Sequence, residues 1–182
     1  MELELQRHDW PSLSSSYGNS SLVPDAIRDL RSAGSRSDAE HALRRLEQVL
    51  PGLAEVTVAA ASVLVHALWG CSPFSIDLVL GVLADLAAGV YEDQPPNERE
   101  VVLRREVLRE IGRGFAAYVE IVESTDVDDS RTACIDLVAA CGEADPGLRE
   151  RACHVLGALL EMERFARYRE LIEASIEELR AA

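Results

Sequence analysis

The chain of 182 residues is long enough to bury a substantial core and is of the size of a single domain. Its composition, 48% hydrophobic and 5% aromatic, suits packed helices, and no apolar run approaches the roughly 18 residues that a bilayer span requires. With 32 acidic against 18 basic residues, the net charge of −14 leaves no basic surplus to neutralise phosphates, which argues against a nucleic-acid partner. A basic protein is the better expected partner.

Residues 1–22 are expected to form an irregular lead-in, because serine, glycine and asparagine dominate the stretch 14–21. Trp10 and Tyr17 are nevertheless large enough to dock on the first helices. The first six residues are acidic and lack the basic start of a signal peptide, so a cytoplasmic protein is expected. The folded domain is expected to cover residues 23–182.

Apolar residues at helical spacing predict four helices in the first half of the chain. The expected ranges are 24–32, 37–50, 56–69 and 73–90. In the second of these, Ser37 and Glu40 form the pattern of a capping box, in which each side chain satisfies a free backbone N–H of the first turn. The third is apolar nearly all round, which predicts a helix that is covered on every side.

The second half of the chain follows an acidic break at 92–97, which is expected to be an exposed loop. A single long helix is expected from 98 to 122, because its apolar stripe keeps phase across Gly112 and Gly114. Each of these glycines costs a helix about 1 kcal/mol relative to alanine, so they mark a weak point of that helix.

Three more helices complete the chain. Asp126 is expected to cap the first of them, and Gly142 to end it. Asp145 followed by Pro146 is a strong start signal for the next, since the proline lacks a donor that the first turn does not need. The last carries apolar residues between 165 and 179. Eight helices and no strand pattern predict an all-α protein.

Two stretches resemble helical-repeat proteins. From Asp145 the sequence reads Asp-Pro-x-Leu-Arg-x-x-Ala-x-x-x-Leu-Gly, which resembles the helix of a HEAT-type repeat. Within roughly residues 10–90, Trp10-x-x-Leu13-x-x-x-Tyr17-Gly18 followed by Val23-Pro24 resembles the opening of a group of bacterial HEAT-like proteins. The resemblance implies a HEAT-like α-solenoid of about eight antiparallel helices in one domain, in which a surface performs the function.

The four cysteines form no C-x-x-C pair and lack further ligands at zinc spacing. They are Cys71, Cys134, Cys141 and Cys153. Buried, reduced thiols are therefore expected, and the chain is expected to bind neither a metal nor a cofactor.

Ser62, His66 and Trp69 share one side of a predicted helix. One interpretation is a nucleophilic serine with a histidine as its base. The other is a histidine whose hydrogen bonds are satisfied inside the core, beside a packed tryptophan. The second interpretation is favoured because no third, orienting residue can be identified. An enzyme is therefore not expected.

The predicted long helix carries arginines interleaved with glutamates. Among them, Arg104, Arg105, Arg109 and Arg113 share the helix with Glu98, Glu100, Glu106 and Glu110. Glu100–Arg104 and Glu106–Arg109 are spaced to pair, so a solvated face of ion pairs is favoured over a phosphate-binding patch.

Acidic residues concentrate in 71–96 and 124–147, which together carry −9 of the net charge of −14. The loops at 92–97 and 143–146 are expected on one edge of the stack, where they would form an acidic rim. Either this rim only keeps the protein soluble, or it binds a basic partner. Its proposed binding residues are Glu92, Asp93, Asp126, Asp128, Asp129, Glu143 and Asp145.

Small bacterial proteins that resemble this chain include immunity proteins for polymorphic toxins. The resemblance thus implies a monomeric protein-binding module that blocks a basic toxin domain through its acidic surface. One alternative is a general scaffold or adaptor that uses the concave face of the stack. A more remote alternative is an enzyme of the helical-repeat DNA glycosylase type, which would need a basic groove.

Overall fold

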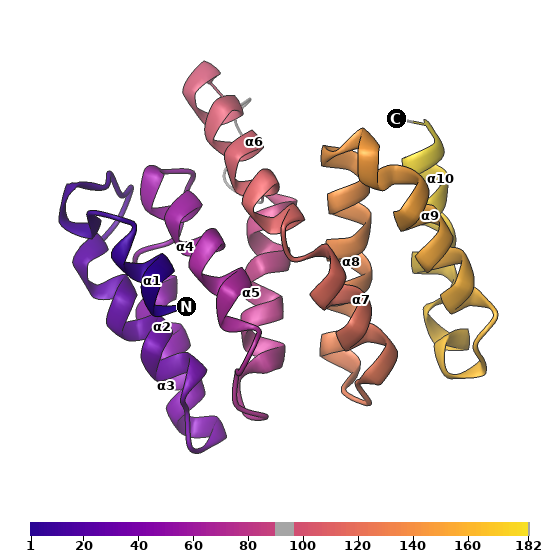
Figure 1. Cartoon of the computed structure of the whole chain (residues 1–182), viewed down its shortest axis with the longest axis horizontal. Coiled ribbons are helices and arrows are strands. Elements are labelled where there is room, and N and C mark those ends of the chain that lie inside the picture. Colours follow the sequence, from indigo (N-terminus) through magenta and orange to yellow (C-terminus); the bar gives the residue numbers. More distant parts are fainter. Residues whose placement is uncertain (90–96, 182) are drawn as a thin grey trace.

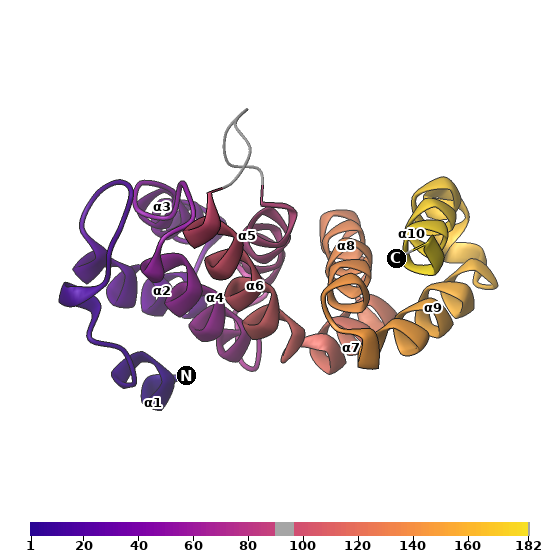
Figure 2. The same ribbon diagram turned by 90° about the horizontal axis from the view of Figure 1, so that it is seen from above.

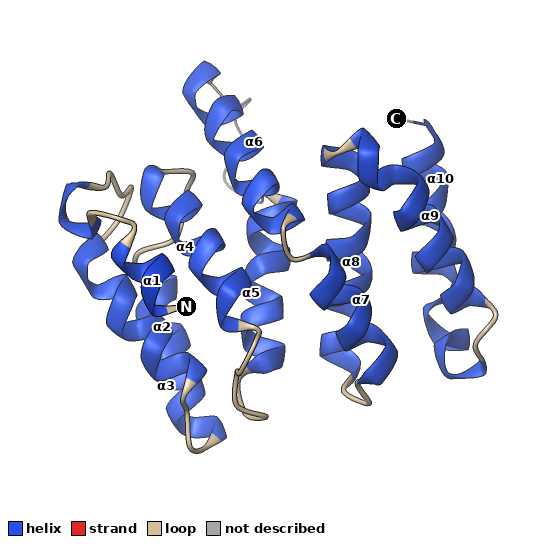
Figure 3. Ribbon diagram, in the orientation of Figure 1, coloured by secondary structure: helices blue, strands red, loops and turns tan. Residues whose placement is uncertain are grey.

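The computed structural model describes residues 1–89 and 97–181, and within them the chain is all-helical (Figure 3). The described residues form ten α-helices and three short 3-10 helices. In chain order they are α1 (Glu2–Gln6), η1 (Trp10–Ser12), η2 (Ser20–Leu22), α2 (Val23–Arg31), α3 (Arg36–Glu47), α4 (Glu55–Ala67), α5 (Ile76–Ala88), α6 (Glu98–Gly112), α7 (Phe115–Ser124), α8 (Asp128–Ala144), α9 (Pro146–Leu160), η3 (Glu163–Tyr168) and α10 (Arg169–Ala181).

The helices stand in a row, from the N-terminal helices at one end to α10 at the other, and mostly alternate in direction, except that α7 continues in the direction of α6 (Figure 1). Figure 2 shows the same row from above. One hydrophobic core runs through it from Leu5 to Leu179. The helix α4 is buried on nearly all sides, as its apolar sequence predicts, and contacts α1, α2, α5 and α6. In the second half, α8 contacts α5, α6, α7, α9 and α10, so it is the central helix there. None of the helices in the described ranges combines the length and the apolar character needed to cross a bilayer.

The start of α9 is confirmed as predicted. The side chain of Asp145 accepts a hydrogen bond of 2.8 Å from the backbone N–H of Gly147, and Pro146 occupies the first helical position. The capping box predicted for Ser37 and Glu40 is wrong. Ser35 caps α3 instead, because its extended backbone places its hydroxyl where it accepts from the N–H of Asp38, while Ser37 lies inside the helix.

The predicted long helix from 98 to 122 is wrong, because the chain turns between α6 and α7. The N–H of Gly114 donates to the carbonyl of Ile111 at 2.8 Å, which tightens and ends the last turn of α6. The fully buried Tyr118 donates its hydroxyl to the same carbonyl at 3.0 Å. The tyrosine fills the space beside Gly114 that a side chain there would occupy.

Two predicted boundaries of α8 are also wrong. Asp126 does not cap it, because Val127 occupies the N-cap position and the Asp126 carboxylate accepts from Arg131. Gly142 does not end it, because the helix continues to Ala144. A Cβ on Gly142 would lie 2.8 Å from the Ala152 side chain, so this glycine lets α9 approach α8 closely. The predicted last helix is divided into η3 and α10. The described residues contain ten α-helices rather than eight, because α1 lies in the expected lead-in and the range 98–122 forms both α6 and α7.

The first 22 residues are more ordered than expected, because they contain α1, η1 and η2 and dock on the helices that follow. Leu5 and Trp10 are buried, and the indole Nε1 of Trp10 donates to the Leu5 carbonyl at 2.8 Å. The Ser62 hydroxyl of α4 donates to the Glu4 carboxylate at 2.6 Å, which fastens α1 to α4. Tyr17, in contrast, is exposed.

Candidate partner-binding surfaces

The acidic residues predicted to bind a partner do not gather at one place. Glu92 and Asp93 lie outside the described residues. Asp126, Asp128 and Asp129 lie at the start of α8, whereas Glu143 and Asp145 lie at its end. A 17-residue helix is about 25 Å long, so these two groups form separate surfaces. The expected single rim is therefore divided by the length of α8.

Asp126 contributes to the fold as well as to the surface. Arg131 places its Nη2 atom 2.9 Å from the Asp126 carboxylate and donates from Nε to the Thr125 carbonyl at 3.1 Å. The Arg131 side chain is only 10% exposed, and its guanidinium also lies over the ring of Phe165, 5.5 Å from the centroid. Arg131 therefore fastens the loop between α7 and α8 to the η3 segment.

Asp128 is likewise engaged within the protein. It pairs with Arg167 and accepts a hydrogen bond of 2.9 Å from the hydroxyl of Tyr168, both on η3. Asp129 is exposed and forms no ion pair with any residue of 1–89 or 97–181. Of the three carboxylates at the start of α8, Asp129 is thus the one without an ion pair among the described residues, although the Asp126 side chain is also exposed.

Trp69 lies on the same side of the molecule as the start of α8 and is 61% exposed. Beside it, the end of α4 and the helix α7 enclose a hollow of about 310 Å³. Its lining residues are Leu68, Trp69, Gly70, Ala117, Glu120, Ile121 and Ser124. The connections α4–α5 and α7–α8 lie along this edge, the lower one in Figure 1. We call the exposed residues Trp69, Glu120, Glu123, Val127 and Asp129 the Trp69 edge.

The predicted cluster of Ser62, His66 and Trp69 is not a catalytic pair. The Ser62 hydroxyl donates to Glu4, and the Nδ1 atom of His66 lies 2.9 Å from the Ser62 backbone carbonyl. The favoured interpretation, a core histidine beside a packed tryptophan, is wrong as well. His66 and Trp69 are both exposed, because they lie on the strip of α4 and its C-terminal end that other helices leave uncovered.

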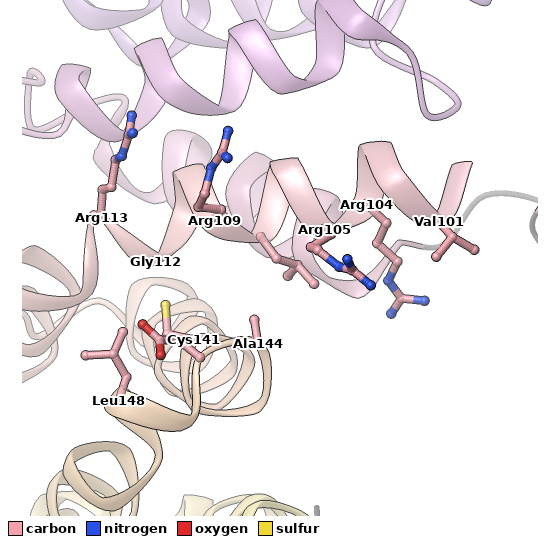
Figure 4. A pocket seen from close by; sticks show the side chains of 11 residues that line it. Val101, Arg104, Arg105, Arg109, Gly112, Arg113, Cys141, Ala144 and Leu148 are labelled. Atoms are coloured by element: carbon pink, nitrogen blue, oxygen red, sulfur yellow. The ribbon is translucent and has the colours of Figure 1, made fainter. Parts of the chain in front are cut away.

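A second hollow lies between α6 and the corner where α8 meets α9 (Figure 4). We call it the arginine groove; its volume is about 820 Å³. Its lining residues are Val101, Arg104, Arg105, Leu108, Arg109, Gly112 and Arg113 on α6, and Cys141, Ala144, Asp145 and Leu148 opposite. The residues that line it thus include four arginines, several apolar side chains and one carboxylate, Asp145, which also caps α9.

The ion pairs along α6 differ from the predicted ones. The side chain of Glu110 is only 2% exposed and pairs with Arg113 and with Arg109, the latter at 3.6 Å. Neither Arg104 nor Arg105 forms an ion pair with a residue of the described ranges. In Figure 4 these two side chains point to the side of α6 where Ala144 lies, whereas Arg109 and Arg113 point away from it.

All four cysteines are free thiols. Burial raises the pKa of Cys134 and of Cys141 to about 12, and that of Cys71 to about 11, so these thiols stay protonated at neutral pH. Across residues 1–89 and 97–181, no three His, Cys, Asp or Glu side chains converge as a metal site would require.

No protein-family profile matches the chain, and neither the curated proteins nor the solved structures include a significant match. The function is therefore argued from the two surfaces alone.

Proposed function

We propose that the chain is a protein-binding module, a HEAT-like α-solenoid that acts as an immunity protein and binds the basic domain of a cognate toxin. The observation that carries the proposal is the exposed Trp69 beside an apolar hollow. Tryptophan is the residue type most enriched among the anchors of protein interfaces, where it fills a desolvated pocket. When a partner covers a large side chain that is 61% exposed, much apolar surface is removed from water, and this stabilises the complex.

The charge of the Trp69 edge supports a basic partner. Glu120 lines the hollow beside the tryptophan, and Glu123 and Asp129 are exposed at the end of α7 and the start of α8, whereas Arg31 is a cation that donates to the Trp69 carbonyl at 3.3 Å. The net charge of −14 adds a long-range attraction that accelerates encounter with a cation-rich surface. The expected complex contains one copy of each protein, with the tryptophan at its centre and the carboxylates around it.

The proposed role places a monomer in the cytoplasm, where a toxin would meet its immunity protein. Four free thiols fit that compartment, since cytoplasmic cysteines are kept reduced. Blocking a toxin requires binding alone, so the proposal includes neither catalysis nor a cofactor.

The experiment is to co-purify the tagged protein with the products of its neighbouring genes and to score growth when each neighbour is expressed with and without it. We expect one neighbour to be toxic, to bind tightly and to lose its toxicity. Trp69→Ala should weaken that complex at least tenfold, mainly through faster dissociation. Asp129→Arg should slow association and reduce its dependence on salt.

Glu177→Arg on α10 is the matched control, because Glu177 is exposed and lies at the far end of the row. It changes the net charge as Asp129→Arg does but should leave binding within twofold. If no neighbour is toxic or bound, the immunity proposal is replaced by a general helical adaptor. An adaptor would bind with little salt dependence, and changes on the helices would weaken it more than Asp129→Arg.

The arginine groove is the one feature that favours the helical-repeat DNA glycosylase as a second candidate, since that enzyme needs a basic groove. The apolar floor and the net charge of −14 oppose binding to duplex DNA. Lack of any binding to duplex DNA at low salt would remove this candidate.

A further inference from the structure

We propose that the arginine groove binds an acidic amphipathic helix of a protein partner. The groove lies at the end of α8 opposite to the Trp69 edge, and its charge has the opposite sign. This proposal is independent of the immunity role, because it involves different residues and a ligand of different chemistry.

The positive charge of the groove is concentrated at Arg104 and Arg105. These guanidinium groups form no ion pair within the described ranges and point to the side of α6 that the groove occupies (Figure 4). Arg109 and Arg113 pair with the buried carboxylate of Glu110 and point to the other side of α6, so they add little to the charge of the groove. In a protein with a net charge of −14, two adjacent arginines without an ion pair among the described residues are a local exception that favours an anionic ligand.

The length of the groove selects an elongated ligand. The lining residues of α6 extend from Val101 to Arg113, a rise of about 18 Å, which corresponds to about three turns of a partner helix. A phosphate ion or a single carboxylate would occupy only a small part of that length.

The floor of the groove selects a ligand that is apolar on one side. Leu108 on α6 and Leu148 on α9 both line it, and Val101, which is 44% exposed, extends the apolar surface toward the start of α6. A nucleic acid presents phosphates along its whole length and would leave these side chains uncovered. A helix with carboxylates along one side and leucine-like residues along the other satisfies both the arginines and the floor, as in other helix-in-groove complexes.

The turn between α6 and α7 keeps this space open. A Cβ built on Gly112 meets no atom within 4 Å, so the end of α6 next to the groove is free of packing. A larger side chain at this position would enter the groove without disturbing the core. Gly112 therefore offers a variant that blocks the groove and leaves the fold intact.

The test uses the full chain and a fluorescently labelled synthetic peptide of about four helical turns, with glutamates on one side and leucines on the other. Fluorescence anisotropy is measured against protein concentration at low and at physiological salt. Two control peptides have the same composition in scrambled order, and lysine in place of each glutamate. We expect saturable binding of the amphipathic acidic peptide and at least tenfold weaker binding of both controls.

Two groove variants should each weaken peptide binding at least tenfold: Arg104→Glu with Arg105→Glu, and Gly112→Leu. Each has a matched control elsewhere on the chain. Arg44→Glu reverses an exposed arginine of α3, and Gly157→Leu enlarges a glycine of α9 that also has open space beside it. Both controls should bind the peptide as the unchanged protein does, and circular dichroism should show all variants folded.

Equal binding of the scrambled peptide, or unchanged binding by both groove variants, would overturn the proposal. Sedimentation of the protein alone tests whether a second copy of this chain occupies the groove. Self-association that Gly112→Leu abolishes would assign the groove to a second copy of this chain instead of a partner helix. Because the Trp69 edge is untouched in these variants, rescue from a toxin should persist in them whichever result is obtained.

Discussion

The side chain of Tyr118 on α7 covers Gly114 in the preceding turn so closely that any side chain there would displace it. A Cβ on Gly114 would meet the tyrosine hydroxyl and the ring carbon that bears it, both well inside contact distance. The hydroxyl donates to the Ile111 carbonyl at the end of α6, so one side chain satisfies the freed backbone and fills the turn. This contact lies where the chain passes from α6 to α7.

Alanine substitutions at two neighbouring glycines should change the free energy of unfolding in opposite directions. Gly114→Ala should lower the free energy of unfolding by about 1–3 kcal/mol, because the buried Tyr118 has to move. Gly112→Ala should raise it by up to about 1 kcal/mol, because the position is helical and has open space. Urea unfolding followed by circular dichroism measures both, and equal effects would contradict the assigned role of Tyr118.

Arg131 should be essential to the stability of the loop before α8. Replacing it with methionine keeps the length of the side chain but leaves the Thr125 carbonyl and the Asp126 carboxylate without their donor. We expect a loss of about 1.5–3 kcal/mol in the free energy of unfolding. Asp129→Asn, in the same first turn, removes a charge with no partner in the described ranges and should change that free energy by no more than about 0.5 kcal/mol.

Protonation of His8 should weaken the docking of the N-terminal segment. Burial and the charge of Arg7 lower the pKa of His8 below 6.5, and the carboxylates of Glu4 and Glu110 only partly oppose this. The side chain is 15% exposed and lies edge-on to Trp10, with 5.4 Å between the ring centroids. A depressed folded-state pKa means that stability is intact above pH 6.5 and falls as the pH drops through the interval down to the folded pKa.

The measurement is the free energy of unfolding between about pH 7.5 and about pH 5, a window above the titration of most carboxylates. His8→Gln should flatten the decline seen in the unchanged protein. His41→Gln, at an exposed position on α3, should leave the decline as it is. An identical slope for His8→Gln and the unchanged protein would show that His8 does not couple folding to pH.

The cysteines should differ in their reaction with iodoacetamide at about pH 8, since the thiolate is the reactive form. Cys134 and Cys141 are buried and have pKa values of about 12, so they should stay unmodified in the folded protein. Cys153 is only half-buried and should react first. Mass spectrometry locates the labels, and denatured protein is the control in which all sites react. Early labelling of Cys141 would reveal opening between α8 and α9.

Helix positions follow well from the sequence wherever an apolar stripe meets a clear breaker. The all-α class is confirmed for the described residues, and α2 lies within one residue of its predicted range, 24–32. Helical periodicity does not predict the break at Gly114, because the apolar residues keep the same helical spacing on both sides of the turn. Only the space that Tyr118 requires decides that the chain bends there. The sequence predicts a helix end at Gly142, because a glycine that ends a helix and a glycine that lets two helices approach closely look alike in sequence.

Whether a residue belongs to one of the two surfaces depends on which other helices cover it. The spacing of residues along one helix does not reveal this. Trp69 occupies a position typical of a core residue and is exposed because no helix packs over it. The pattern on α6 shows arginine interleaved with glutamate, but not that Glu110 turns inward. Nor does it show that Leu148, far along the chain, lies opposite to the arginines.

The opposite placement of the two surfaces on α8 has a consequence for stoichiometry. An occupant of the Trp69 edge and an occupant of the arginine groove are separated by about 25 Å, so neither excludes the other. Because the helix fixes this spacing, two occupants bound at the same time would be held about 25 Å apart, and only a ligand that reaches both surfaces would bind the second one intramolecularly. A protein of this size would then be bivalent, with one end that attracts cations and one that attracts anions.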